Sequence, residues 1–158
     1  MSDSGDSPGA DQGGVAVPHQ TTASPAQVWA VLADGWTYAA WVVGTSRIRA
    51  VDVTWPQPGS RVHHSVGSWP LLLNDETEVL EATAPGHLVL QARGRPVGEA
   101  RVSIDVRPTG AGATITIRED ATHGPTRLLP AALRQLVVIP RNRESLRRLA
   151  YLAERDGR

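Results

Sequence analysis

The 158-residue sequence contains no cysteine. This absence excludes disulfide frameworks, thiolate metal sites and cysteine nucleophiles, and it leaves only histidine, aspartate and glutamate as candidate metal ligands. The sequence also lacks a Walker A motif, a dinucleotide fingerprint, an HExxH zinc motif and a GxSxG nucleophile motif. We therefore expect neither a metal ion nor a cofactor.

Long apolar runs are also missing. No run is long enough to cross a bilayer, and residues 1–14 have neither the basic region nor the apolar region of a signal peptide. The expected location is therefore the cytoplasm, without stable membrane insertion. The formal net charge is zero, from 16 basic and 16 acidic residues, so nucleic acid is not an expected partner.

The length of the chain is that of one domain, and it suffices to bury a core without disulfides or metal. Residues 1–14 are rich in serine, glycine and aspartate and have little to bury. Ordering them would cost backbone entropy without compensation, so we expect a disordered tail. Residues 15–156 are predicted to form a single domain, either a monomer or a homodimer.

Helical signals occur near both ends of this domain. Ser24 is a favourable N-cap and Pro25 suits the first helical position, which predicts a short helix there. A second short helix is expected over residues 37–42. Residues 125–156 have apolar residues at helical spacing, which predicts a long C-terminal helix. Pro140 is expected to bend or divide that helix.

Alternating apolar and polar residues between the helical segments indicate β-strands separated by turns rich in proline and glycine. The seven predicted strands cover residues 15–22, 47–55, 61–66, 74–82, 88–93, 100–107 and 114–120. Antiparallel strands with helices on one face are typical of an α+β layer architecture. We expect a curved antiparallel sheet whose concave face holds the long helix.

Several segments together suggest a family: SPAQVW at 24–29, LAD at 32–34, WVVG at 41–44, WP with PGS at 55–60, and RESLRRL at 143–149. They resemble the START-like and birch-pollen-allergen-like (SRPBCC) superfamily, in its bacterial polyketide cyclase/dehydrase and lipid-transport branch. The resemblance implies a helix-grip fold with an apolar cavity that binds lipids, hormones or aromatic polyketides. It does not imply one activity, because one fold supports many functions.

Strand alternation assigns the residues that face this cavity, because residues i and i+2 point to the same side. By this rule His64 and Glu119 face inward with the apolar residues of their strands. The adjacent His63 faces outward, so the two histidines cannot chelate one metal. The predicted ligand-binding residues are Tyr38, Trp41, His64, Asp75, Thr77, Val102, Ile104, Ile115, Ile117, Glu119, Leu133, Leu136 and Val137.

Each polar or aromatic candidate has an alternative interpretation. An inward-facing histidine or carboxylate indicates mutual pairing, water or a polar ligand group, but it is also compatible with a wet cavity mouth. Tyr38 and Trp41 could stack on a planar ligand or simply pack. Arg141 and Asn142 could contact a ligand carboxylate or phosphate, although an arginine on a helix surface is more often solvated.

Three functions remain open. The first is binding of a small hydrophobic ligand, such as a lipid, acyl or polyketide-like metabolite, in an internal cavity. The second is a polyketide cyclase or dehydratase-type enzyme in which His64 or Glu119 takes a proton α to a carbonyl. The third is a protein or membrane interaction module that uses the basic C-terminal helix, since residues 127–158 hold eight arginines and three acidic residues.

Overall fold

The computed structural model describes residues 14–94 and 98–157, so residues 1–13 of the predicted tail lie outside it. Within these ranges one seven-stranded antiparallel sheet has the strand order β1-β7-β6-β5-β4-β3-β2. The strands are β1 (Val17–Thr21), β2 (Thr45–Val51), β3 (Arg61–Val66), β4 (Leu73–Thr83), β5 (His87–Gly94), β6 (Gly98–Pro108) and β7 (Ala113–His123). The helices are α1 (Pro25–Leu32), η1 (Gly35–Thr37), α2 (Tyr38–Trp41), η2 (Pro125–Leu128) and α3 (Ala131–Asp156).

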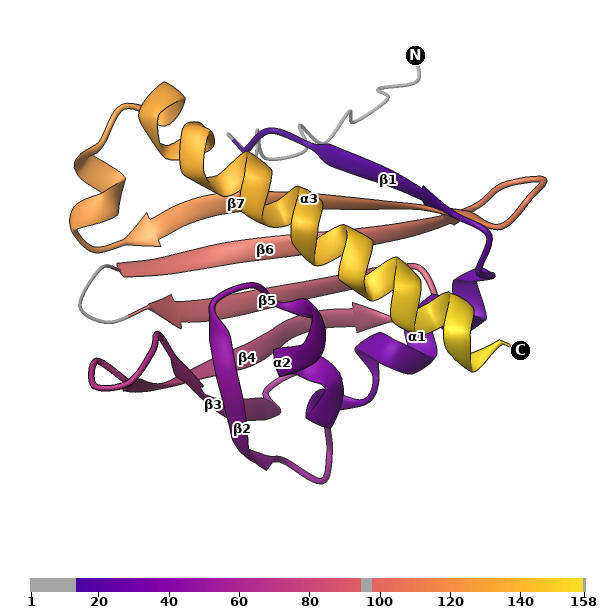
Figure 1. Ribbon diagram of the computed structural model, residues 1–158, viewed down its shortest axis with the longest axis horizontal. Helices are drawn as coiled ribbons and strands as arrows, with labels where there is room; N and C mark the ends of the chain where they lie inside the picture. The colour runs from indigo at the N-terminus through magenta and orange to yellow at the C-terminus, as the bar shows by residue number, and fades with distance from the viewer. Residues whose placement is uncertain (1–13, 95–97, 158) are drawn as a thin grey trace, which may run out of the picture.

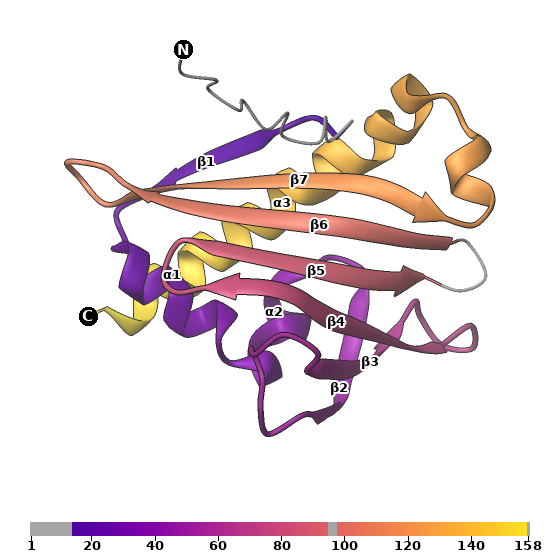
Figure 2. The same ribbon diagram turned by 180° about the vertical axis from the view of Figure 1, so that it is seen from behind.

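The helices cover one face of the sheet. In Figure 1 the long helix α3 runs diagonally across the sheet, and α1 and α2 lie on the same side of it. Figure 2 shows the opposite face, which no helix in the described part of the chain covers. This arrangement confirms the predicted α+β class and the helix-grip fold, in which a curved sheet wraps around the last helix.

The first helix begins where the sequence predicts. Ser24 Oγ accepts a hydrogen bond from the Gln27 N–H at 3.2 Å, and Gln27 Oε1 accepts one from the Ser24 N–H at 2.7 Å. This reciprocal capping box satisfies two backbone donors, and Pro25 needs none at the first helical position. The second predicted helix, over residues 37–42, is present as the short α2 directly after η1.

The C-terminal helix departs from the prediction in two ways. Helical structure is not continuous from residue 125, because η2 ends at Leu128 and α3 starts only after Pro130, which occupies the N-cap. Pro140 does not divide α3, which runs through it as one helix. An internal proline costs roughly 3 kcal/mol, which the burial of Leu146, Leu149 and their neighbours on the same helix offsets.

Strand β2 is also shorter than predicted, ending at Val51 rather than at residue 55. The Asp52 carboxylate accepts a hydrogen bond from the Arg61 N–H at 2.9 Å, which closes the hairpin early. The indole N–H of Trp55 then donates to the carbonyl oxygen of Leu32 at 3.1 Å. Trp55 therefore fastens the hairpin loop to the end of α1 instead of extending the sheet.

The hydrophobic core lies between the concave face of the sheet and the C-terminal half of α3. Ile104 and Ile115 from the sheet are fully buried there, as are Leu146 and Leu149 from α3. Val28 of α1 closes the same core. This packing holds the second half of α3 in place and so fixes the position of the residues at its middle, where the candidate site lies.

Candidate functional site

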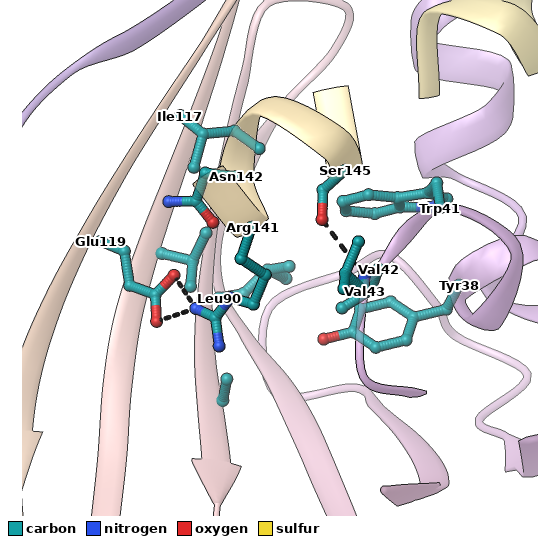
Figure 3. A pocket seen from close by; sticks show the side chains of 12 residues that line it. Tyr38, Trp41, Val42, Val43, Leu90, Ile117, Glu119, Arg141, Asn142 and Ser145 are labelled. Carbon is teal, nitrogen blue, oxygen red and sulfur yellow. Dashed lines mark hydrogen bonds and ion pairs between the residues drawn. The ribbon is translucent and has the colours of Figure 1, made fainter. Parts of the chain in front are cut away.

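A pocket of about 100 Å³ lies where α2 and the middle of α3 meet the concave face of the sheet (Figure 3). Its walls are mostly apolar, and its polar groups come from one strand and two helices. The lining residues are Tyr38, Trp41, Val42, Val43, Leu90, Ala92, Val102, Ile117, Glu119, Arg141, Asn142 and Ser145.

The sheet side of the pocket follows from the strand register. Leu90 of β5 lies opposite Val102 of β6, which in turn lies opposite Glu119 of β7. Directly opposite residues of antiparallel strands point to the same face, so these three form a row across the concave side. Ala92 is two residues from Leu90 in β5, and Ile117 is two residues from Glu119 in β7. Both therefore line the pocket on the same face of the sheet.

Glu119 and Arg141 form an ion pair at the edge of the pocket. One guanidinium nitrogen of Arg141 donates to both carboxylate oxygens of Glu119, as the dashed lines in Figure 3 show. The Glu119 side chain is only 11% exposed and that of Arg141 is 39% exposed. Since a buried carboxylate is costly without a partner, the ion pair explains how Glu119 is tolerated inside the pocket.

Two amide side chains on the inner side of α3 have unsatisfied atoms. Among the described residues, neither Nδ2 of Asn142 nor Oε1 of Gln135 has a hydrogen-bond partner, although both atoms are buried. Seven residues separate them, so they lie about two turns apart on one face of the helix. An unpaired buried polar group costs about 1–3 kcal/mol, so a polar ligand atom that pairs with Asn142 would recover that energy.

A buried hydrogen-bonded chain starts at the pocket and runs behind it. The Tyr38 hydroxyl lies 3.0 Å from Oγ1 of Thr77, which lies 2.9 Å from Nε2 of His64. The rings of Tyr38 and His64 stack with their centroids 5.2 Å apart. Trp41 packs edge-on against Tyr38 at 5.5 Å. The phenol that lines the pocket is thus connected to a buried imidazole through a single hydroxyl group.

Burial sets the protonation states of Tyr38 and His64, the two ends of this series of hydrogen bonds. It raises the pKa of Tyr38 to about 12, so the phenol stays protonated at neutral pH and can act as a hydrogen-bond donor. Burial also lowers the pKa of His64 below its usual value of 6.5, so the imidazole is neutral. Both groups are therefore uncharged near neutral pH.

This burial predicts an acid-sensitive fold. Below pH 6.5 an unfolded His64 binds a proton while the folded imidazole stays neutral, so the free energy of unfolding should fall as the pH drops toward the lowered pKa. A His64→Gln variant should lose less stability over that range, measured by denaturant unfolding at several pH values. His123→Gln, at an exposed histidine, is the matched control and should behave as wild type. Equal acid sensitivity in His64→Gln and wild type would contradict the prediction.

The predicted site residues fall into three groups. Those that line the pocket are Tyr38, Trp41, Val102, Ile117 and Glu119. Those that face inward but are buried in the core without lining the pocket are His64, Asp75, Thr77, Ile104 and Ile115. The third group, Leu133, Leu136 and Val137, is exposed and does not line the pocket.

The position of the third group has a simple geometric cause. Val137 and Leu146 are nine residues apart, or about two and a half helical turns, which places them on opposite faces of α3. Leu146 is buried against the sheet, so Val137 points away from it. Leu133, Leu136 and Val137 therefore do not face the pocket as the sequence analysis expected, and Gln135 and Asn142 occupy the inner positions instead.

Other lining residues escaped the sequence analysis. Leu90 and Ala92 share one parity in a predicted strand, so alternation could have found them. Val42 and Val43 follow the end of α2, where no periodic pattern applies. Ser145 was part of a family-like segment, and its Oγ accepts a hydrogen bond from the Val43 N–H at 3.2 Å, which links α3 to the end of α2.

Within residues 14–94 and 98–157, no group of three or more His, Asp or Glu side chains is arranged to hold a metal ion. None of the helices in these ranges has the length and apolar character needed to span a bilayer.

Solved structures resemble this fold closely at low sequence identity. Protein NE0264 from Nitrosomonas europaea superposes with a TM-score of 0.70 at 16% identity, covering 90% of this chain and 95% of that one. The di-domain ARO/CYC StfQ from the steffimycin biosynthetic pathway gives 0.71 at 12% identity, over 90% of this chain and 51% of StfQ. Ara h 8.0201 superposes with a TM-score of 0.65 at 10% identity, covering 89% of this chain and 97% of that one. A search of the curated proteins finds no match.

The family comparison agrees with these structural likenesses. The family described as "Polyketide cyclase / dehydrase and lipid transport" matches residues 14–154, nearly the whole described chain. The fold and this match confirm the resemblance to the START-like superfamily. The chain therefore belongs to the polyketide cyclase/dehydrase and lipid-transport family.

Proposed function

We propose that the chain binds a small hydrophobic ligand, of the lipid, acyl or polyketide-like kind, in the pocket between α2, α3 and the concave face of the sheet. The observation that carries the proposal is the unpartnered Nδ2 of Asn142 in a pocket whose walls are mostly apolar. Apolar walls provide affinity, and a few converging polar groups provide orientation.

The polar side of the pocket suggests how the ligand is oriented. Glu119 already neutralises Arg141, so the pair does not call for a fully charged ligand group. Asn142 offers a donor, and the protonated Tyr38 hydroxyl lies close to the same space. A neutral acceptor, such as a carbonyl or hydroxyl oxygen, suits these donors, while the rest of the ligand contacts Leu90, Val102 and neighbouring apolar residues.

The pocket must widen to take a whole metabolite. Its volume of about 100 Å³ is below the roughly 300–1,000 Å³ of typical ligand sites. The start of α3 can supply the space, because the first residue of this helix that packs against the core is Ile139 and its fully buried residues begin at Asn142. A helix segment without buried anchors moves at low cost, so we propose that the ligand displaces residues 131–138 from the sheet and leaves the ion pair of Arg141 with Glu119 in place.

Filling the pocket should block binding. Ala92 lines the pocket, so an Ala92→Phe substitution should reduce the affinity for an apolar ligand at least about tenfold by occupying ligand space. Ala50→Phe places the same side chain at an exposed position of β2 and is the matched control. The measurement is native mass spectrometry with extraction of any copurified compound, followed by titration with that compound or with a fluorescent fatty acid.

The two variants separate the possible outcomes. A copurified apolar compound that is lost from Ala92→Phe and retained by Ala50→Phe would support the pocket as the binding site. Unchanged binding by Ala92→Phe, or no binding of any apolar compound by the wild type, would overturn the proposal.

A second candidate is an enzyme of the cyclase or dehydratase type. The hydrogen bonds that connect Tyr38 through Thr77 to His64 favour it. A protonated phenol in the pocket can donate to a substrate carbonyl, and the neutral imidazole behind it can exchange the proton through Thr77. His64 itself does not line the pocket, so it would act only through this relay. Chemical conversion of the copurified compound by wild type but not by Tyr38→Phe would favour this candidate over simple binding.

A further inference from the structure

Thr77 has one hydroxyl proton and two neighbours that can accept it. Its Oγ1 lies 3.0 Å from the Tyr38 hydroxyl oxygen and 2.9 Å from Nε2 of His64. The Thr77 side chain is fully buried, and within residues 14–94 and 98–157 its hydroxyl has no other hydrogen-bond partner. Since a buried O–H without an acceptor is costly, Thr77 must donate either to Tyr38 or to His64.

The position of the proton on the His64 ring decides between these two directions. The imidazole is neutral, because burial lowers its pKa, and it therefore carries one N–H. If the proton is on Nε2, His64 donates to Thr77, Thr77 donates to the Tyr38 oxygen, and the Tyr38 O–H is free to point into the pocket. If the proton is on Nδ1, Nε2 accepts from Thr77, and the Tyr38 proton is used up by Thr77.

The surroundings of Nδ1 favour the first arrangement. Nδ1 of His64 is buried and has no hydrogen-bond partner among the described residues. A buried N–H without an acceptor is rare in proteins, and an unsatisfied acceptor is less so. The free proton of Tyr38 instead lies at a pocket of about 100 Å³, where water or a ligand oxygen has room to accept it. A proton on Nε2 therefore leaves the unpaired donor where an acceptor can reach it.

The charged groups beside His64 act in opposite directions on its ring. Asp75 lies directly opposite His64 in the β3–β4 ladder, and its Oδ1 accepts a hydrogen bond from the Glu76 N–H at 2.9 Å. Arg49 donates to the carbonyl oxygens of both His64, at 3.3 Å, and Asp75, at 2.9 Å. The Asp75 carboxylate raises the pKa of His64, whereas the Arg49 guanidinium lowers it. Arg49 thus opposes the attraction of Asp75 for a proton on Nδ1.

We infer that His64, protonated on Nε2, and Thr77 are positioning residues that direct the O–H of Tyr38 into the pocket, and that the pocket therefore selects ligands with a carbonyl oxygen. The selection rests on the proposed binding function, but the direction of the hydrogen bonds does not. All three groups donate toward the pocket, and each bond polarises the next, which makes the last O–H a better donor. Figure 3 shows the Tyr38 hydroxyl extending toward the side of the pocket that holds Leu90. A carbonyl oxygen only accepts, so it matches a free O–H there.

The tautomer of His64 can be measured directly by NMR of the full chain, labelled with ¹⁵N-histidine, at neutral pH. Two-bond ¹H–¹⁵N correlations distinguish a protonated from an unprotonated ring nitrogen. The His64 signals are those missing from His64→Gln, and they should not titrate with the four more exposed histidines, which identifies them even if that variant does not fold. We expect a protonated Nε2 and an unprotonated Nδ1. A protonated Nδ1 would overturn the inference.

The selection of ligands is tested with 1-indanone and indane, which differ by a carbonyl in place of a methylene group. Their affinities are measured by competition with a fluorescent fatty acid, and the ratio of the two is compared between variants. Tyr38→Phe should lower the preference for 1-indanone about fivefold, the value of one hydrogen bond. Tyr151→Phe, at an exposed tyrosine on α3, is the matched control and should keep the wild-type ratio.

Thr77→Val separates the two hydrogen-bond directions. If Tyr38 donates into the pocket, removing the Thr77 hydroxyl should leave the preference for 1-indanone equal or lower. A higher preference would mean that the variant had freed a phenol proton held by Thr77, and it would overturn the inference, as would an unchanged ratio in Tyr38→Phe. If wild type binds neither compound, the proposed binding function fails and the selection of carbonyl ligands with it, while the NMR result still decides the direction of the hydrogen bonds.

Discussion

Replacing Leu146 by alanine is expected to lower the free energy of unfolding by about 2–5 kcal/mol, as is usual for deleting a buried leucine side chain. Leu146 is fully buried between α3 and the concave face, so the substitution leaves a cavity in the core. Denaturant unfolding followed by circular dichroism measures the change. The loss should be among the largest for any single substitution in α3.

The same substitution at Leu136, in the first half of α3, provides the control. Leu136 is exposed, so Leu136→Ala removes no buried contact and should change stability by less than about 0.5 kcal/mol. The pair tests whether α3 is held by its C-terminal half alone. Comparable losses in both variants would show that the N-terminal half is also packed, and the proposed widening of the pocket would then fail.

Removing Arg141 should produce the second large effect. Arg141→Met leaves the largely buried Glu119 carboxylate without its partner, and we expect a loss of about 1–3 kcal/mol at neutral pH. This range is below that of a fully buried pair because the arginine side chain is partly exposed to solvent. Adding Glu119→Gln should restore most of the loss, since the uncompensated charge is then removed.

A double-mutant cycle measures this coupling directly. The single variants, the double variant and the wild type are compared by denaturant unfolding under identical conditions. Arg147→Met breaks an exposed ion pair with Glu144 on the same helix and should leave stability unchanged within error. Additive losses for Arg141→Met and Glu119→Gln would mean that the two side chains are not coupled in solution.

The pairing of Glu119 and the burial of His64 help to decide between a carrier and an enzyme. Glu119 is held by Arg141, and His64 reaches the pocket only through Thr77 and Tyr38. An acid/base role for either residue therefore requires that the ion pair opens or that a proton passes along the hydroxyl chain. Binding requires neither change, which is why we place it first.

Local patterns predicted most of the fold. Alternation located every strand to within a few residues, because most of the strands have one buried face that imposes a period of two. The capping box at Ser24 placed the start of α1. Boundaries failed where long-range contacts decide them, as at Asp52, whose contact with Arg61 ends β2 early.

The site was harder to predict than the fold. Strand parity correctly turned Glu119 and Val102 inward, but parity cannot say which inward positions lie under a helix and which line open space. His64 and Thr77 are inward and fully covered, while Glu119 borders the pocket. The difference depends on where α2 and α3 cross the sheet.

By itself the sequence determined the order of strands and helices and the inner face of several strands, because these follow from periodicity and local capping within a few residues. It also indicated the family, through the resemblance of the segments between residues 24 and 149. Only the tertiary structure decided that Arg141 pairs with Glu119, that Asn142 faces the pocket and that the leucines of the first half of α3 face outward. Those positions depend on the rotation of α3 about its own axis. That rotation is set by packing of its C-terminal half against strands distant in sequence, which no local pattern encodes.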